Sequence, residues 1–178
     1  MNQSIATKES SDVLFVISRE FDAPVERMYR AWTEEDRLNA WWGPEGFELR
    51  RGVLDFCRGG IFHYCLRDPG GVEMWGKWVI TQILPGRRLD FIVAFCDENA
   101  GEPVRHPYEP DWPLEVSTEV IFSPSDAGTR VEVRWVPLNA SEAERRTFAA
   151  GRDACRTGWT GTFDRLEGYL LEEGRRDS

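Results

Sequence analysis

Few residues in this chain could carry out catalysis, and their spacing matches none of the common catalytic arrangements. A nucleophilic triad needs a serine or cysteine beside a histidine base, and only two histidines are present, His63 and His106. His63 alternates with the aromatic residues Phe62 and Tyr64, so we expect it to point away from any cavity that these aromatics line. No G-x-S-x-G or phosphate-binding motif occurs. We therefore predict no catalytic residues, and an enzyme is the less favoured class.

The four cysteines do not form a metal-binding pattern. Cys57, Cys65, Cys96 and Cys155 include no C-x-x-C pair, whereas a zinc site needs closely spaced Cys and His ligands. We expect inert thiols, no metal and no cofactor. Met1–Asp12 is polar and lacks the apolar core of a secretory signal. We interpret it as a flexible lead-in to a cytoplasmic protein, in which thiols stay reduced.

Two acids in a proline-rich segment are the remaining candidates for proton transfer. Asp97–Pro113 contains four prolines, so it cannot form a central strand. Glu109 and Asp111 lie there, close to Trp112. If the segment covers a pocket, either acid could orient a polar group of a ligand or act as a base. The preferred interpretation is that both are solvated loop acids.

Length and composition indicate an ordinary globular domain that is unusually rich in aromatic residues. The chain has 178 residues, of which 41% are hydrophobic and 12% aromatic, and we assign residues 13–174 to one domain after the lead-in at 1–12. Its 22 basic and 31 acidic residues give a net charge of −9, which argues against nucleic-acid binding. No apolar stretch approaches the roughly 18 residues that span a bilayer, so we expect no membrane association.

Turn-forming residues divide the chain into strands and helices. Two short amphipathic helices follow the first strand, with Asp22 and Thr33 as expected N-caps, and the second ends at Gly43-Pro44. Seven strands are expected, and the short loops between most of them predict antiparallel pairing. These strands are Val13–Phe21, Phe47–Phe56, Gly60–Arg67, Glu73–Leu84, Arg88–Cys96, Glu115–Phe122 and Arg130–Trp135.

A long helix is expected at the end of the chain. Ser141 and Glu144 form a capping box, and an apolar stripe then runs from Phe148 to Leu170 at helical spacing. Gly151 and Gly158 lie just beside this stripe, although glycine inside a helix costs about 1 kcal/mol relative to alanine. Two interpretations stay open: the glycines allow close packing on the sheet, or they form the wall of a cavity.

The order of elements predicts an α+β fold in which an antiparallel sheet of six to seven strands curves around the final helix. Such a sheet is not easily filled by one helix, so we expect a pocket suited to a planar or lipid-like molecule. The strand Glu73–Leu84 is apolar on both sides, which suggests that a homodimer covers its second face. The side chains expected to line the cavity are Trp41, Trp42, Phe62, Tyr64, Trp78, Phe91, Phe95, Trp112, Phe122, Trp135, Trp159 and Phe163.

Several motifs resemble one known family. The sequence WWGPEGF at residues 41–47 follows AWT at 31–33, with FDAP at 21–24, RGG at 58–60 and GTRV at 128–131. Together these motifs resemble the activator of heat-shock protein 90 ATPase homologue family, in the SRPBCC or START-like superfamily, over roughly residues 13–172. The resemblance implies the helix-grip fold of birch-pollen-allergen proteins. It also implies hydrophobic ligand binding or, from the family name, a chaperone-associated role in the stress response.

Three functions are therefore weighed. The first is a binding protein for a small hydrophobic or aromatic molecule, whose identity the sequence does not give. The alternative is a chaperone-associated or other protein-interaction module, and the second alternative is an enzyme acting on a bound hydrophobic substrate. An open apolar cavity would favour binding, a filled core would favour protein interaction, and convergent Asp, Glu, His or Tyr side chains would favour catalysis.

Overall fold

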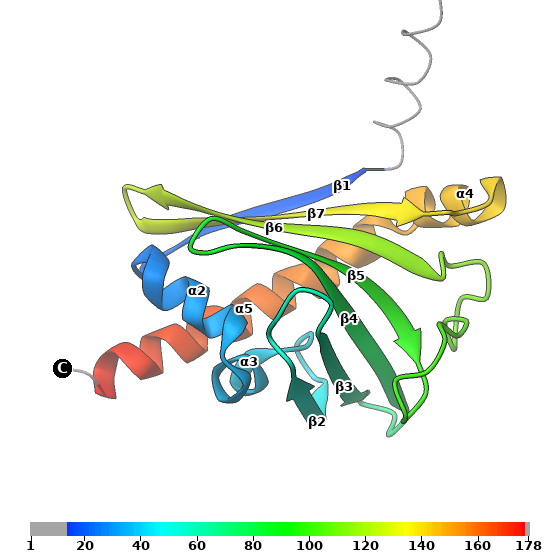
Figure 1. Cartoon of the computed structure of the whole chain (residues 1–178), viewed down its shortest axis with the longest axis horizontal. Helices are drawn as coiled ribbons and strands as arrows, with labels where there is room; N and C mark the ends of the chain where they lie inside the picture. The colour runs from blue at the N-terminus through cyan, green and yellow to red at the C-terminus, as the bar shows by residue number, and fades with distance from the viewer. Residues whose placement is uncertain (1–13, 177–178) are drawn as a thin grey trace, which may run out of the picture.

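A curled antiparallel sheet wraps around a long helix in this computed structural model, which describes residues 14–176 (Figure 1). The sheet has seven strands in the order β1-β7-β6-β5-β4-β3-β2. The predicted α+β helix-grip fold is confirmed, whereas the predicted lead-in at 1–12 lies outside the described residues. The elements are β1 Phe15–Phe21, α2 Val25–Thr33, α3 Glu35–Trp41, β2 Glu48–Leu54, β3 Ile61–Arg67, β4 Glu73–Leu84, β5 Arg88–Cys96, β6 Glu115–Ser125, β7 Gly128–Leu138, α4 Glu142–Ala150 and α5 Arg152–Arg176.

The register of the strands decides which side chains share the concave face. Tyr64 of β3 pairs with Gly76 of β4, which in turn pairs with Phe95 of β5. Directly opposed residues point to the same side of a sheet, so these three positions form one row across it. The apolar residues of this face pack against α5, because alternation in each strand sends one set of side chains inward.

The two short helices α2 and α3 are held by buried tryptophans rather than by the predicted caps. Neither Asp22 nor Thr33 caps a helix: Pro24 and Glu34 precede α2 and α3, and no side chain bonds the first turn of either. Thr33 instead completes α2, and its hydroxyl donates to the carbonyl oxygen of Tyr29 at 2.9 Å. Trp41 is fully buried, and its indole N–H donates to a backbone carbonyl of α2 at 2.9 Å.

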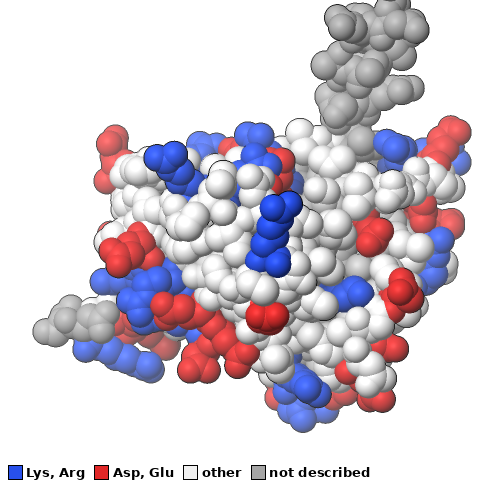
Figure 2. Space-filling model, viewed as in Figure 1, with Lys and Arg blue, Asp and Glu red and all other residues white. Residues whose placement is uncertain are grey.

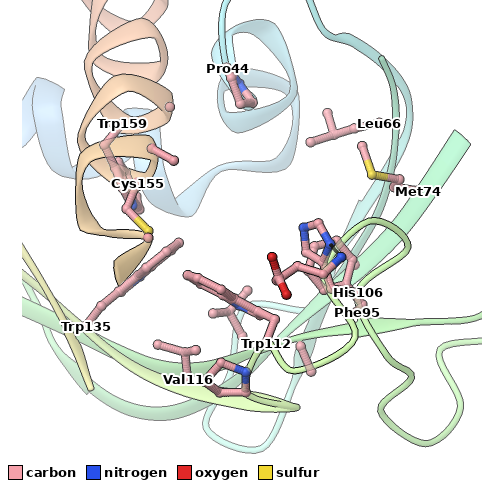
Figure 3. Close-up of a pocket in the computed structure, with 18 of the residues that line it drawn as sticks. Pro44, Leu66, Met74, Phe95, His106, Trp112, Val116, Trp135, Cys155 and Trp159 are labelled. Atoms are coloured by element: carbon pink, nitrogen blue, oxygen red, sulfur yellow. Dashed lines mark hydrogen bonds between the residues drawn. The ribbon is translucent and has the colours of Figure 1, made fainter. Parts of the chain in front are cut away.

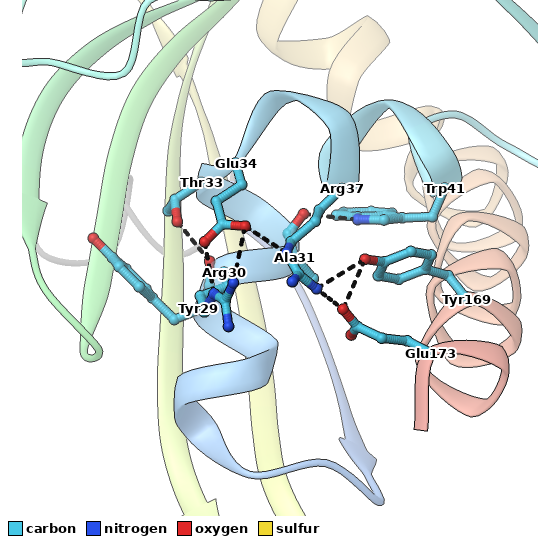
Figure 4. Close-up of polar contacts among 9 residues, drawn as sticks. All are labelled: Tyr29, Arg30, Ala31, Thr33, Glu34, Arg37, Trp41, Tyr169 and Glu173. Carbon is cyan, nitrogen blue, oxygen red and sulfur yellow. Dashed lines mark hydrogen bonds and ion pairs between the residues drawn. The ribbon is translucent and has the colours of Figure 1, made fainter. Parts of the chain in front are cut away.

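Polar contacts join α3 to the far end of α5 (Figure 4). Arg37 forms ion pairs with Glu34 and with Glu173, and it also donates to the hydroxyl of Tyr169 at 3.2 Å. Arg30 completes the cluster with a 2.6 Å ion pair to Glu34. The C-terminal part of α5 is thus tied to the short helices as well as to the sheet.

The final helix is bent, which corrects the prediction of one continuous helix. The predicted capping box is present, since Ser141 accepts from the backbone N–H of Glu144 and the Glu144 carboxylate accepts from that of Ser141. The helix then divides at Gly151 into α4 and α5. A Cβ at Gly151 would lie 3.0 Å from the ring of Trp112, so the glycine lets this ring pack against the bend.

The convex side of the sheet is partly covered by the chain itself. Trp75 of β4 stacks on His63 at 4.8 Å between ring centroids, and the guanidinium of Arg51 lies 6.0 Å from its ring. Lys77 donates to backbone carbonyls of the segment after β5. These contacts account for much of the apolar character on the second side of β4, and the homodimer stays a prediction.

The surface is mixed in charge. On the face shown in Figure 2, basic side chains are interspersed with acidic ones and do not gather into one continuous patch. A sequence with net charge −9 therefore offers no basic surface on this face for a phosphate backbone. Between residues 14 and 176, no helix is both long enough and apolar enough to cross a membrane.

Candidate functional site

A cavity of about 720 Å³ lies between the concave face of the sheet, α5 and the segment that joins β5 to β6. Figure 3 shows its labelled side chains arranged around a central space, with Cys155 and Trp159 from α5 on one side and Leu66 and Met74 from the sheet opposite. Most of the wall is apolar or aromatic. A space of this size and character is typical of sites that enclose small organic molecules.

Eight of the twelve aromatic residues expected at the cavity lie on its wall, and four do not. Those on the wall are Trp42, Tyr64, Trp78, Phe91, Phe95, Trp112, Trp135 and Trp159. The other four pack in the core behind it: Trp41 against Trp32, Phe62 against Trp78, Phe122 against Tyr29, and Phe163 against Phe21. Alternation along a strand assigns a face, but the position along that face decides whether a ring meets the cavity or the core.

The cavity residues predicted from the sequence are all aromatic, so the aliphatic residues of the wall were missed. Leu66 and Met74 pair across β3 and β4 and line the cavity, as do Val93 and Val116 on the neighbouring strands. A signal for them was present in the sequence, because Leu66 shares its strand parity with Tyr64.

The two glycines beside the helix stripe have different roles. A Cβ at Gly158 would meet no atom within 4 Å, and Gly158 lines the cavity, so its missing side chain leaves open volume there. Gly151 also borders the cavity but serves close packing against Trp112. Gly158 thus fits the cavity-wall interpretation, whereas Gly151 allows close packing against the segment between β5 and β6 rather than against the sheet.

Tyr64 is the polar group at the sheet side of the cavity. Its phenol crosses Gly76, where a Cβ would lie 2.6 Å from the hydroxyl oxygen, so only glycine allows this position. Burial raises the pKa of Tyr64 well above its usual range, while the neighbouring indole N–H groups of Trp42 and Trp78 act in the opposite direction. Tyr64 therefore stays protonated at any physiological pH.

The segment between β5 and β6 brings His106 and Glu109 to the cavity wall. The Nδ1 atom of His106 accepts from the backbone N–H groups of Tyr108 and Glu109 at 3.1 and 3.0 Å. Neutral His106 therefore carries its proton on Nε2. Burial lowers the pKa of His106, opposed by the Glu109 carboxylate. Asp111, the other candidate acid, does not line the cavity.

This segment is tied down at two further points. The hydroxyl of Tyr108 donates to Asp68 at 2.7 Å, which joins it to the turn between β3 and β4. Arg105 forms an ion pair with Glu144, which joins it to α4 and lowers the pKa of that carboxyl. The covering position that the sequence suggested for this segment is thus held by polar contacts to both the sheet and the final helices.

The WWGPEGF segment forms the cavity wall opposite, and one arginine holds it. Arg165 of α5 donates through Nη1 to the carbonyl oxygens of Gly43, Pro44 and Phe47 at 3.1, 3.3 and 3.1 Å. Burial lowers the pKa of Arg165. The segment lies directly on the helix, since a Cβ at Gly161 would be 2.9 Å from its backbone.

This motif is part of a match that covers most of the chain. The family model described as "Activator of Hsp90 ATPase homolog 1-like protein" matches residues 22–171. The chain belongs to this family. The match includes α2, α3, β2–β7 and nearly all of the final helices, so the cavity and both of its tethered walls lie within the family domain.

Solved structures share the fold of this member of the Hsp90 ATPase activator homologue family. Protein NE0264 from Nitrosomonas europaea is 21% identical, with a TM-score of 0.73 over 93% of this chain and 98% of that one. Protein Ms6760 from Mycobacterium smegmatis is 22% identical, with a TM-score of 0.73 over 90% and 92% of the two chains. A protein from Arthrobacter aurescens is 24% identical, with a TM-score of 0.73 over 92% and 88%. No curated protein matches.

The other residues of this family member that were considered for catalysis or metal binding lie away from the cavity or are not grouped into a site. His63 is on the convex face, as its parity predicts, and its Nε2 lies 3.1 Å from the carbonyl oxygen of Asp97. Among residues 14–176, no three His, Cys, Asp or Glu side chains are grouped so as to hold a metal ion. Cys65 and Cys96 are buried free thiols, and burial raises the pKa of Cys155 to about 11, so none of these three is a ready nucleophile.

Proposed function

We propose that this protein binds a small, largely apolar aromatic molecule in the cavity between the sheet and α5. The observation that carries the proposal is the cavity itself, about 720 Å³ of space walled by tryptophan, phenylalanine and aliphatic side chains. Close packing is the rule inside proteins, so a hollow of this size walled by aromatic side chains needs an explanation. Gly158 supports it, because a larger residue there would fill volume that the glycine leaves open.

The polar groups favour binding over catalysis. Tyr64 lies on β3, whereas His106 and Glu109 come from the covering segment. His106 has its Nδ1 occupied by two backbone N–H groups, so in the neutral form it has no free lone pair with which to act as a base. Cys155 lacks a histidine partner in the described contacts and has a raised pKa. These arrangements orient a ligand more readily than they activate a nucleophile.

A chaperone-associated role is the second candidate, and family membership is the observation that favours it. We rank it below ligand binding because a core built only as an interaction scaffold has no need of an open cavity. The four free thiols fit a reducing compartment, and we place the protein in the cytoplasm on that basis.

The proposal is tested by comparing ligand binding by the wild-type protein, by the Gly158→Leu variant and by a matched control variant. Titration of the wild-type protein with a panel of naphthalene, anthracene and biphenyl derivatives should quench Trp fluorescence and raise the melting temperature. A ligand at 100 times its Kd stabilises by about 2.7 kcal/mol. Gly158→Leu should fill the cavity and weaken binding at least tenfold while the protein stays folded.

The control is Gly168→Leu, because Gly168 is an exposed glycine of the same helix with no atom within 4 Å of its added Cβ. It should bind like the wild type. If the panel produces no shift in the wild-type protein, or if both leucine variants bind equally well, the proposal is wrong and the chaperone-associated role takes first place.

A further inference from the structure

The polar atoms buried at the inner wall of the cavity indicate which apolar molecules fit. Trp42 and Trp78 lie against each other at 4.6 Å between ring centroids, and Trp42 lies 5.6 Å from Tyr64. The indole nitrogens of both tryptophans are buried and have no hydrogen-bond partner of normal geometry within the described chain. Both nevertheless lie close enough to the Tyr64 hydroxyl to affect its ionisation.

The three groups differ in what they can offer. An indole N–H only donates, whereas a phenol hydroxyl can both donate and accept. The two indole N–H groups near the phenol have no acceptor of normal geometry, so this part of the wall is rich in hydrogen-bond donors. None of the hydrogen bonds described for residues 14–176 uses this hydroxyl as a donor, and Tyr64 lines the cavity.

The charge of the wall restricts the partner of this donor. Among residues 14–176, no lysine or arginine lines the cavity, and Glu109 is the only acid on its wall. A carboxylate ligand would lose its hydration without gaining a positive partner, which is costly. A pure hydrocarbon would leave the Tyr64 O–H buried and unpaired, which is also unfavourable.

Resting on the proposed function, we infer that the cavity selects neutral aromatic ketones or other neutral carbonyl compounds, with the carbonyl oxygen accepting a hydrogen bond from Tyr64. Phe95, Trp135 and Trp159 line the same cavity and supply the apolar surface for the aromatic part of such a molecule. Gly76 is the residue that makes the arrangement feasible, since any side chain there would displace the phenol.

Three probes of similar shape test this inference by calorimetry: 2-acetylnaphthalene, 2-ethylnaphthalene and 2-naphthoate. The wild-type protein should bind the ketone about fivefold to tenfold more tightly than the hydrocarbon, the factor expected for one net hydrogen bond, and more tightly than the carboxylate. Tyr64→Phe should abolish the preference for the ketone, because it removes both the donor that the ketone uses and the unpaired O–H that disfavours the hydrocarbon. The control is Tyr29→Phe, which removes a hydroxyl outside the cavity wall and should keep the preference.

The outcomes separate this inference from the proposed function. Equal binding of ketone and hydrocarbon by the wild type overturns the inference but leaves the cavity as a binding site. Tighter binding of the carboxylate, or a ketone preference that persists in Tyr64→Phe, also overturns it. If none of the three probes, nor any of the wider panel, binds to the wild-type protein, the proposed function itself fails.

Discussion

Trp159 is the side chain on which the contact between α5 and the sheet depends most. It is 5% exposed and lies within 6.3 Å of the rings of Trp32, Trp42, Trp135 and Phe163, measured between centroids. Removing a buried Trp side chain typically costs about 3–5 kcal/mol. One face of Trp159 already borders the cavity, so fewer contacts are lost than in a solid core. We therefore expect Trp159→Ala to lower the free energy of unfolding by about 3 kcal/mol.

Denaturant unfolding followed by circular dichroism measures this change directly. For a chain of this length, about 3 kcal/mol corresponds to a fall in Tm of roughly 6–12 °C. The matched control is Trp75→Ala, which removes the same atoms from the convex face, where Trp75 is half-buried against His63 and Arg51. We expect the control to lose about 1 kcal/mol. A loss below about 1 kcal/mol for Trp159→Ala, or equal losses for both variants, would refute the argument that α5 is anchored to the sheet through this ring.

Two further predictions concern the walls of the cavity. Arg165→Met keeps an unbranched apolar stem but removes the guanidinium and its three hydrogen bonds to backbone carbonyls. It should cost about 2 kcal/mol and speed hydrogen exchange at residues 43–47, and unchanged exchange would contradict this expectation. The Tyr108 hydroxyl and nearby backbone N–H groups lower the pKa of Asp68, so the ionised form favours the tethered segment. This tether is fully present above about pH 4, the ordinary value, and is lost as pH falls through the lowered pKa. Exchange at residues 105–112 should therefore rise on acidification, and Asp68→Asn should remove that pH dependence.

The strands were predictable because each is bounded by local signals. β4 and β5 begin and end at the predicted residues, where Pro69-Gly70 and Pro85-Gly86 form the turns. The capping box at Ser141 was equally local, since both partners lie within one helical turn. The helix-grip fold then follows from the order of these elements together with the resemblance of the WWGPEGF segment.

The features that could not be predicted depend on contacts between distant parts of the chain. At the bend, Trp112 packs against Gly151, and only the folded position of the covering segment brings that ring to the helix. The division of aromatic residues between cavity and core also depends on where α5 crosses the sheet. Phe122 has the correct alternation for the concave face, yet it packs against Tyr29 of α2 rather than facing the open space. Strand periodicity predicts which face of the sheet a side chain lies on, but not whether it lies beside the cavity or beside α2.

The contacts between Arg165 and the WWGPEGF segment leave the ligand-facing side chains of this wall free to change. The hydrogen bonds described for the Arg165 guanidinium all go to main-chain oxygens of the WWGPEGF segment, while Pro44 and Phe47 line the cavity. The main-chain atoms of these residues therefore fix the position of the wall, while their side chains determine which ligand it favours. Substitutions at 44 and 47 can alter the ligand that is accepted without disturbing the clamp, which makes this wall the natural starting point for redesigning the protein as a sensor for a chosen aromatic compound.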